Sequence, residues 1–255
     1  MVRVLDLRPP PDGAEHVVGS ATEYADLRRA AEGIDAVVHC AMGSHQWTTP
    51  DGVADAFDVN VKSVHLTLMA AHDAGVPHAV HISSMSVYQN LTRRRLEEAE
   101  PPDATDIYGL TKRLGEEVCL AATVEWGLSV NVLRLVWPTP DDVWPAWGPW
   151  TTPKVLHTGD GTPIHATAAS DLGRALLAAL DHRDGFQRFT ISGEEFIDAG
   201  ESVVAIVNQR GRAKATGIPV DMRFAQVWTF RDGQAIRMQM YASPDDALEA
   251  VGLSG

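Results

Sequence analysis

Two side chains suited to proton transfer lie four residues apart in the segment Tyr108-Gly-Leu-Thr-Lys112. The surrounding residues 107–126 have helical periodicity, and residues four apart on a helix project from one face. A free phenol has a pKa of about 10, and a nearby ammonium lowers that pKa because it favours the phenolate. We therefore expect Tyr108 to exchange a proton with a substrate hydroxyl or carbonyl, while Lys112 tunes it. The spacing alone also fits two solvated residues of a helix surface.

A row of hydroxyl side chains precedes this pair, in Ser83-Ser84-Met85-Ser86-Val87-Tyr88. It directly follows residues 78–83, an apolar run that predicts a strand. In an open parallel sheet, ligands bind at the carboxyl ends of the strands, so we expect Ser83 and Ser84 where the chemistry occurs. Asn60 lies inside a predicted helix, where an asparagine indicates either a function or a surface position.

Strands and helices alternate along the first half of the chain. Each predicted helix shows the 3.6-residue apolar period, and the strands are short apolar runs. This alternation predicts an α/β fold with a parallel sheet covered by helices on both faces. The predicted strands are residues 2–7, 35–42, 78–83, 128–136 and 189–192, and the predicted helices are residues 21–32, 54–74, 107–126 and 170–182, the last capped by Ser170.

Beyond about residue 197 the pattern changes to strands without helices between them. Residues 202–208, 219–230 and 234–241 predict strands, Asp232-Gly233 predicts a hairpin turn, and a capped helix begins after Ser243. We therefore expect a boundary near residue 197, with one domain over 1–196 and a small antiparallel β/α segment over 197–255. Residues 137–153 hold four tryptophans and five prolines, which predicts a loop. That loop is either a wall of a substrate pocket or a plug over a sheet edge.

Six motifs follow one another along the chain: Val4-Leu5-Asp6, Asp35-Ala-Val-Val-His-Cys-Ala41, Asn60, Ser83-Ser84-x-x-Val87-Tyr88, Tyr108-x-x-x-Lys112 and Leu133-Arg134. This ordered set resembles the extended short-chain dehydrogenase/reductases, also called the NAD-dependent epimerase/dehydratase family, over about residues 2–193. The resemblance implies a Rossmann-like fold and an NAD(P)-dependent oxidoreductase or epimerase/dehydratase. Its substrate would be a hydroxyl or carbonyl small molecule such as a nucleotide-sugar, converted by Tyr/Lys-assisted hydride transfer.

The resemblance also implies a role for each matching residue. Tyr108 would be the catalytic acid/base, and Lys112 would lower its pKa and hold the nicotinamide ribose. Ser84 would bind the substrate hydroxyl, and Asn60 would orient substrate and water. Asp6 would bind the adenosine ribose, which favours NAD, although the adjacent Arg8 can accommodate the 2′-phosphate of NADP. The other implied cofactor contacts are Leu7, Ser20, Cys40, Ala41, Met42, Ser83, Trp137 and Pro138.

One part of the family pattern is missing from residues 1–255. A dinucleotide fold holds the pyrophosphate on a glycine-rich turn about 20 residues before the ribose-binding acid, and here that acid is Asp6. The sequence looks like a family member that lacks its front end, and its buried strand edges would need partners. Two alternatives stay open: a relic or fusion protein that no longer binds the dinucleotide well, and a start codon placed too far downstream.

The tail contains the segments Asp198-Ala-Gly200, Val227-Trp-Thr-Phe-Arg-Asp-Gly233 and Ala247-Leu-Glu-Ala-Val-Gly-Leu253. With these segments, residues 196–253 show a second, weaker resemblance, to the C-terminal half of SnoaL-like domains. Half of such a fold leaves an apolar sheet face that should pack on the α/β domain or on another chain. A homodimer is therefore an expectation, and catalysis is not assigned to this segment.

Composition excludes several function classes. The net charge is 21 − 34 = −13, and an acidic surface repels nucleic acid and anionic lipid. No signal pattern or membrane-length apolar run is visible, so a cytoplasmic location is the default. The two cysteines form no disulfide framework or metal motif. His78-x-x-His81 does not predict a metal site, because residues three apart on a strand face opposite sides.

Overall fold

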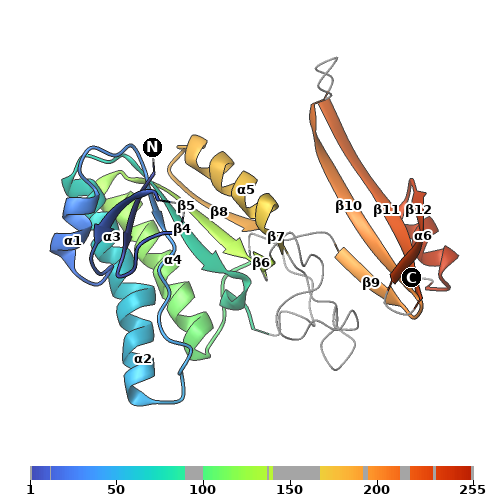
Figure 1. Ribbon diagram of the computed structural model, residues 1–255, viewed down its shortest axis with the longest axis horizontal. Helices are drawn as coiled ribbons and strands as arrows, with labels where there is room; N and C mark the ends of the chain where they lie inside the picture. Colours follow the sequence, from blue (N-terminus) through green and yellow to red (C-terminus); the bar gives the residue numbers. More distant parts are fainter. Residues whose placement is uncertain are drawn as a thin grey trace. The chain divides into compact units, whose positions relative to one another are not determined.

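The computed structural model describes residues 2–11, 13–89, 100–136, 138–139, 167–191, 195–212, 219–231 and 234–253 (Figure 1). The chain divides into two compact units, one of Met1–Leu135 with Gly173–Ile191 and one of Val136–Leu172 with Ser192–Gly255. Most of the predicted loop at 137–153 and the predicted turn at Asp232-Gly233 lie outside the described residues. None of the helices in the described ranges has the length and hydropathy of a membrane span.

The described residues of the first unit form six parallel strands in two sheets. Strand β1 (Arg3–Asp6) pairs with β2 (Glu15–Val18). The second sheet has the order β3-β4-β5-β8, formed by Val37–His39, His78–Ser84, Ser129–Leu135 and Phe186–Ile191. Within the described ranges, no strand is hydrogen-bonded to the other edge of β1 or of β3. Strand β3 is shorter than the strand predicted over residues 35–42. Because β3 lies at the edge of the sheet, Val37 and Val38 are only half-buried.

Helices cover both faces of the four-stranded sheet, as predicted (Figure 1). On one face, Val64 and Leu68 of α3 (Ser63–Asp73) and Cys119 of α4 (Ile107–Trp126) form a core with Ala79 and Val130. On the other face, the side chains of two strand residues hydrogen-bond to a carbonyl of α5 (Ala169–Asp181). These residues are His78 and Asn131, and the carbonyl belongs to Ala179.

The predicted helix over 54–74 is three elements. It begins earlier, as α2 (Pro50–Phe57), because the Thr49 side chain accepts the Gly52 N–H and Pro50 suits a first helical position. A π-helical segment, η1 (Asp58–Lys62), separates α2 from α3 and contains Asn60. Helix α1 (Tyr24–Ala30) is shorter than predicted. Helix α5 begins before Ser170, so the prediction that Ser170 caps it is wrong.

Helix α4 has the predicted bounds, and both of its ends show why. Asp106 caps its start by accepting the Gly109 N–H at 3.0 Å, and Gly127 ends it with a φ of 69°. A Cβ atom on Gly109 would lie 2.2 Å from the Ser86 carbonyl oxygen. This close approach seats the start of α4 against the turn that follows β4.

The second unit contains an antiparallel sheet in the order β12-β11-β10-β9. Its strands are β9 (Glu195–Ala199), β10 (Ser202–Arg212), β11 (Pro219–Arg231) and β12 (Gln234–Tyr241). The sequence analysis does not predict β9. Helix α6 (Pro244–Ala250) is capped by Ser243 and packs Ala247 against Val204 and Val227. The prediction of a small antiparallel β/α segment at the C-terminus is confirmed. The same unit holds a short parallel pair, β6 (Pro138–Thr139) with β7 (Thr167–Ala168).

Candidate active site

Ser84 and Tyr108 lie together at the carboxyl end of β4. Ser84 is the last residue of that strand, and its side chain accepts a hydrogen bond from the Ser86 N–H at 3.1 Å. Tyr108 is in the first turn of α4, next to Gly109, which contacts the same turn. The Ser84 hydroxyl is a hydrogen-bond partner of the Tyr108 phenol. The structure therefore brings these two predicted site residues together.

The phenol of Tyr108 holds its proton more strongly than a free tyrosine does. Burial raises its pKa, the hydrogen bond from Ser84 lowers it, and the Asp106 carboxylate raises it, with a net rise. Loss of solvent is the largest of these effects, so the net direction of the pKa is upward. A lowering of this pKa by Lys112 stays a prediction. At neutral pH Tyr108 is a proton donor.

Lys112 lies one helical turn after Tyr108 and is buried, with 3% of its surface exposed. Its ammonium donates a hydrogen bond to the Ile82 carbonyl at 3.0 Å. Burial lowers the pKa of Lys112 to about 8, and nearby Cys40, Cys119 and Glu116 act in the opposite direction. An amine with this pKa can hold or release a proton close to neutral pH.

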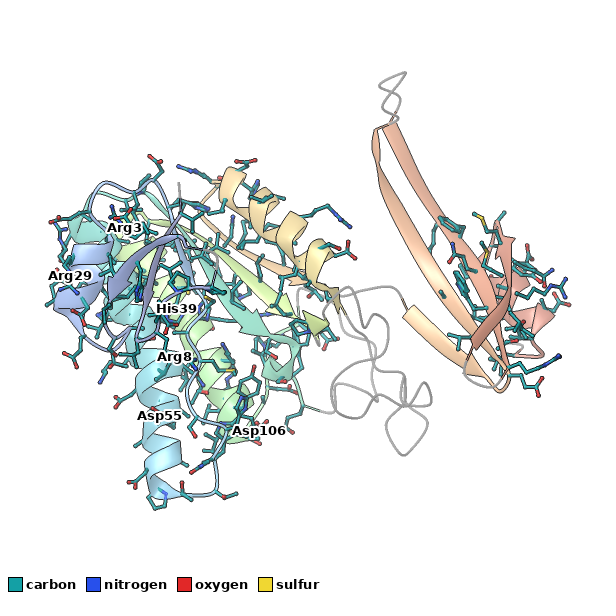
Figure 2. All side chains as sticks on the ribbon, viewed as in Figure 1. Arg3, Arg8, Arg29, His39, Asp55 and Asp106 are labelled. Atoms are coloured by element: carbon teal, nitrogen blue, oxygen red, sulfur yellow. The ribbon has the colours of Figure 1, made fainter. Side chains whose placement is uncertain are left out.

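The carboxyl ends of β1 and β3 carry the next predicted residues. Asp6 ends β1, and its carboxylate accepts the Arg8 N–H at 2.8 Å, while Leu7 and Arg8 are exposed. Cys40 follows β3. Cys40 is an exposed residue, but partial loss of solvent around its sulfur raises the pKa of the thiol, while the Lys112 ammonium lowers this pKa and the Asp6 carboxylate raises it. Asp6, Cys40 and Lys112 are thus close enough to act on one another. Figure 2 labels Arg8 after β1, His39 in β3 and Asp106 before α4.

Asn60 connects two parts of the site. It is buried, and its Oδ1 atom accepts the Gly43 N–H at 3.0 Å. Its Nδ2 atom donates to Thr111 Oγ1, also at 3.0 Å. Gly43 is in the loop after β3, and Thr111 directly precedes Lys112. The amide therefore fixes that loop against α4.

Ser83 points into the interior of the unit. Its hydroxyl donates to Glu116 Oε1 at 2.7 Å. Glu116, on α4, pairs in turn with Arg134 of β5 and Arg188 of β8. Ser83 thus belongs to a buried polar network that joins α4 to three strands.

The other predicted contacts occupy loops. Ser20 follows β2, and its backbone N–H donates to the Asp26 carboxylate at 3.0 Å. Ala41 and Met42 follow Cys40 in the loop after β3, where Met42 is exposed. Two predicted contacts are not part of the first unit as described: Pro138, which belongs to β6 of the second unit, and Trp137, which lies outside the described residues.

Trp47 is a neighbour of Tyr108 that the motifs do not indicate. Its indole stacks on the phenol, with ring centroids 5.0 Å apart and ring planes at 18°. Trp47 lies in the loop after β3. The only signal for it in the sequence is this position, because loops at the carboxyl ends of parallel strands carry ligand-binding residues.

Two buried histidines lie beneath the site. His39 Nε2 is 2.7 Å from Ser63 Oγ, and His81 Nδ1 is 3.2 Å from His39 Nδ1. Burial lowers the pKa of His39 to about 3 and that of His81 well below its usual value, so both are neutral. His78 faces the opposite side of the sheet, towards Ala179. Within the described part of the chain, no group of three ligand-type side chains could hold a metal ion.

Comparison with protein families identifies the class of protein. The model of the NAD dependent epimerase/dehydratase family matches residues 3–138, which is more than half of the chain. The match runs from β1 through β5 and includes the region of Ser84, Tyr108 and Lys112. The chain belongs to the NAD-dependent epimerase/dehydratase family.

Individual relatives agree with this. The uncharacterized protein y4nG of Sinorhizobium fredii is 27% identical over 136 residues, 52% of this chain and 34% of that protein. The chain therefore spans about a third of the length of that relative. A short-chain dehydrogenase/reductase superfamily protein from Agrobacterium tumefaciens, solved with bound NAD, is 26% identical with a TM-score of 0.64, over 76% of this chain and 70% of that chain. MoeE5 in complex with UDP-glucose and NAD is 25% identical with a TM-score of 0.59, over 80% and 69%.

Proposed function

We propose that this chain is an NAD(P)-dependent oxidoreductase or epimerase/dehydratase that acts on a hydroxyl or carbonyl group of a small molecule. The observation that carries this proposal is the contact of Ser84 with Tyr108, one helical turn before Lys112. Both the family and the fold support it, because this contact lies at the carboxyl end of a parallel strand, where such folds bind ligands.

The residues present fit the two ends of a dinucleotide. At one end, Asp6 is exposed at the end of β1 and carries a carboxylate, the group that bonds a ribose hydroxyl. At the other end, the Lys112 ammonium has three donors, of which one is used by Ile82. The sequence 1–255 contains no G-x-x-G-x-x-G or G-x-G-x-x-G turn for the pyrophosphate. Asp6 and Lys112 are therefore the residues we assign to NAD, with NADP as the alternative.

The proton transfer follows from the state of Tyr108. Its phenol is protonated at neutral pH, so Oη can give its proton to a carbonyl oxygen of the substrate, and the phenolate takes it back in the reverse direction. The Ser84 hydroxyl, next to the phenol, donates a hydrogen bond to the same substrate oxygen and orients it. When bound, the nicotinamide supplies the redox chemistry by accepting or returning a hydride. The Lys112 ammonium stabilises the phenolate when the proton has left.

The substrate class is part of this proposal. MoeE5 is solved with UDP-glucose, which supports a nucleotide-sugar as the first compound to test. The net charge of −13 makes an anionic macromolecule a poor partner.

A second candidate is a family member that has kept the scaffold without efficient cofactor binding. The observation behind this alternative is that no glycine-rich turn for the pyrophosphate occurs within residues 1–255. The two candidates differ in one measurable property, the affinity for the dinucleotide.

Titration of the purified 255-residue protein with NADH, followed by the fluorescence of the bound nicotinamide, separates them. We expect micromolar binding that is weakened at least tenfold in Lys112→Ala. The matched control is Lys62→Ala, which removes an exposed lysine paired with Asp58 and should leave binding unchanged. No binding to the folded protein at millimolar NADH would reject the enzyme and support the second candidate.

A further inference from the structure

An indole ring covers the residue to which we assign the acid–base role. The rings of Trp47 and Tyr108 stack, with centroids 5.0 Å apart and planes at 18°. His45 lies against Trp47 in turn, at 5.5 Å and 55°. Rings stacked in this way shield their shared faces from water. One face of the phenol is thus closed by the protein itself.

The loop that carries Trp47 is fixed at its start. The Gly43 N–H donates to Asn60 Oδ1 at 3.0 Å, and the Ser44 N–H donates to the Asp55 carboxylate. Asn60 also donates to Thr111, three residues after Tyr108 on α4. One buried amide therefore holds both the loop of Trp47 and the helix of Tyr108.

The same loop is fixed at its end. Thr49 Oγ1 accepts the Gly52 N–H at 3.1 Å and donates to the Gln46 carbonyl at 3.2 Å. A Cβ atom on Gly52 would lie 1.9 Å from that carbonyl oxygen, so the loop packs against α2 where only glycine fits. Trp47 is therefore placed by contacts on both sides of it.

Two contacts fix the position of the Tyr108 phenol. The Ser84 hydroxyl meets it at the oxygen, and the Trp47 indole meets it at the ring face. The backbone beneath it is held because Asp106 caps α4. The phenol of Tyr108 is buried enough that loss of solvent is the main influence on its pKa, in the upward direction.

We propose that Trp47 is a positioning residue for Tyr108, whose indole holds the phenol in one orientation and keeps water from its face. This inference rests on the acid–base role proposed above for Tyr108. A phenolate without water is less stable, so the proton stays on Tyr108 until a substrate oxygen takes it. A fixed ring also presents its hydroxyl in one direction, which favours transfer. Trp47 acts through Tyr108 and not on the reacting atoms.

Site-resolved titration of the tyrosines tests this without cofactor or turnover. The chain has four tyrosines, so protein labelled with ¹³C at the tyrosine Cζ gives four resonances, and Tyr108→Phe assigns one of them. We compare Trp47→Leu, which removes the aromatic face, with Trp47→Phe, which keeps one. The control is Trp126→Leu, because Trp126 stacks on His72 at 5.4 Å and 18° elsewhere in the same unit.

We expect Trp47→Leu to lower the titration midpoint of Tyr108 by about half a pH unit or more, because water reaches the phenolate. Trp47→Phe should stay close to the wild type, and Trp126→Leu should not change the midpoint. The wild-type midpoint can lie above the accessible pH range. In that case, a Tyr108 chemical shift that changes with pH in Trp47→Leu but stays constant in the wild type also shows that the midpoint is lower in the variant. The Tyr24 and Tyr88 resonances report whether each variant is folded.

An unchanged midpoint in Trp47→Leu would overturn the inference, as would an equal fall in Trp47→Phe or in Trp126→Leu. These outcomes are separate from those of the NADH titration. If NADH does not bind while the Tyr108 midpoint still falls in Trp47→Leu, the proposed function fails and the positioning of the phenol by Trp47 stands.

Discussion

Arg134 and Glu116 form a two-point ion pair inside the first unit, with Nε 2.9 Å from Oε1 and Nη2 2.6 Å from Oε2. Their side chains are 1% and 0% exposed. The pair joins β5 to α4, and Glu116 lies four residues after Lys112 on the same helix. The orientation of the helix that carries the candidate site therefore depends on one buried carboxylate.

Glu116→Ala should destabilise the protein by about 3–5 kcal/mol, because it removes the carboxylate that balances the charge of the buried Arg134 guanidinium. Urea unfolding measures this loss. Asp58→Ala is the control: it breaks the exposed pair of Asp58 with Lys62, at 2.8 Å, and should cost less than about 1 kcal/mol. Equal losses in the two variants would show that the buried pair does not hold the unit together.

Tyr108→Phe should reduce turnover by about 100- to 10,000-fold while NADH binding and thermal unfolding stay as in the wild type, because only the transferable proton is lost. Steady-state rates with the substrate found by screening measure this. Tyr24→Phe removes a hydroxyl that bonds Asp73 and should leave turnover unchanged. Full activity of Tyr108→Phe would end the assignment of Tyr108 as the acid–base residue.

Lys112→Met should stabilise the protein at neutral pH. The pKa of the buried ammonium is about 8, against 10.5 for an ordinary lysine. The unfolded chain therefore binds this proton more tightly than the folded protein does, and wild-type stability should rise as the pH increases from about 8 to 10.5. Below that range the cost of the buried charge is fully present, so its removal should gain about 1–3 kcal/mol.

Urea unfolding of both proteins in steps between neutral pH and about pH 10 measures this difference. The gain should shrink as the pH rises, because the wild type loses its penalty there. A loss of stability in Lys112→Met at neutral pH would mean that the hydrogen bond to Ile82, at 3.0 Å, outweighs the desolvation of the ammonium.

Asn60→Asp and Thr111→Val should each cost about 1–2 kcal/mol, because each removes the hydrogen bond between Nδ2 of Asn60 and Oγ1 of Thr111. Aspartate still offers an acceptor to the Gly43 N–H. The double variant should cost less than the sum of the two, since the same bond is lost. Additive losses in this cycle would contradict a direct link between the loop after β3 and α4.

Local signals in the sequence account for the parts of the fold that were predicted. The bounds of α4 follow from the cap at Asp106 and the left-handed Gly127. The position of Ser84 at the carboxyl end of a parallel strand could be predicted from the strand pattern. Its place in one site with the Tyr108 phenol was implied by the resemblance to the family. The antiparallel strands of the second unit follow from alternation and from turn residues. The SnoaL-like character of that unit stays a prediction.

What could not be predicted depends on contacts between distant residues. The π-helical turn at Asn60 has no strong local signal, so the apolar period predicts a single helix over residues 54–74. Strands β2 and β9 are four and five residues long, too short for a clear period. The stacking of Trp47 on Tyr108 joins the loop after β3 to the first turn of α4, which only the fold brings together. The raised pKa of Tyr108 is likewise a property of its burial and not of its spacing from Lys112.

The separation of β1 and β2 from the larger sheet has a consequence for local opening. These two strands are joined to the rest of the unit through α1: Arg3 bonds the Ala30 carbonyl at 3.0 Å, and Tyr24 bonds Asp73 of α3. With fewer ladder hydrogen bonds, β1 and β2 should exchange their amide hydrogens faster than β4 and β5, as a separate cooperative unit. We therefore expect Asp6 to belong to a less stable folding unit than Tyr108 and Lys112, and a ligand held by both groups should slow exchange most strongly in β1.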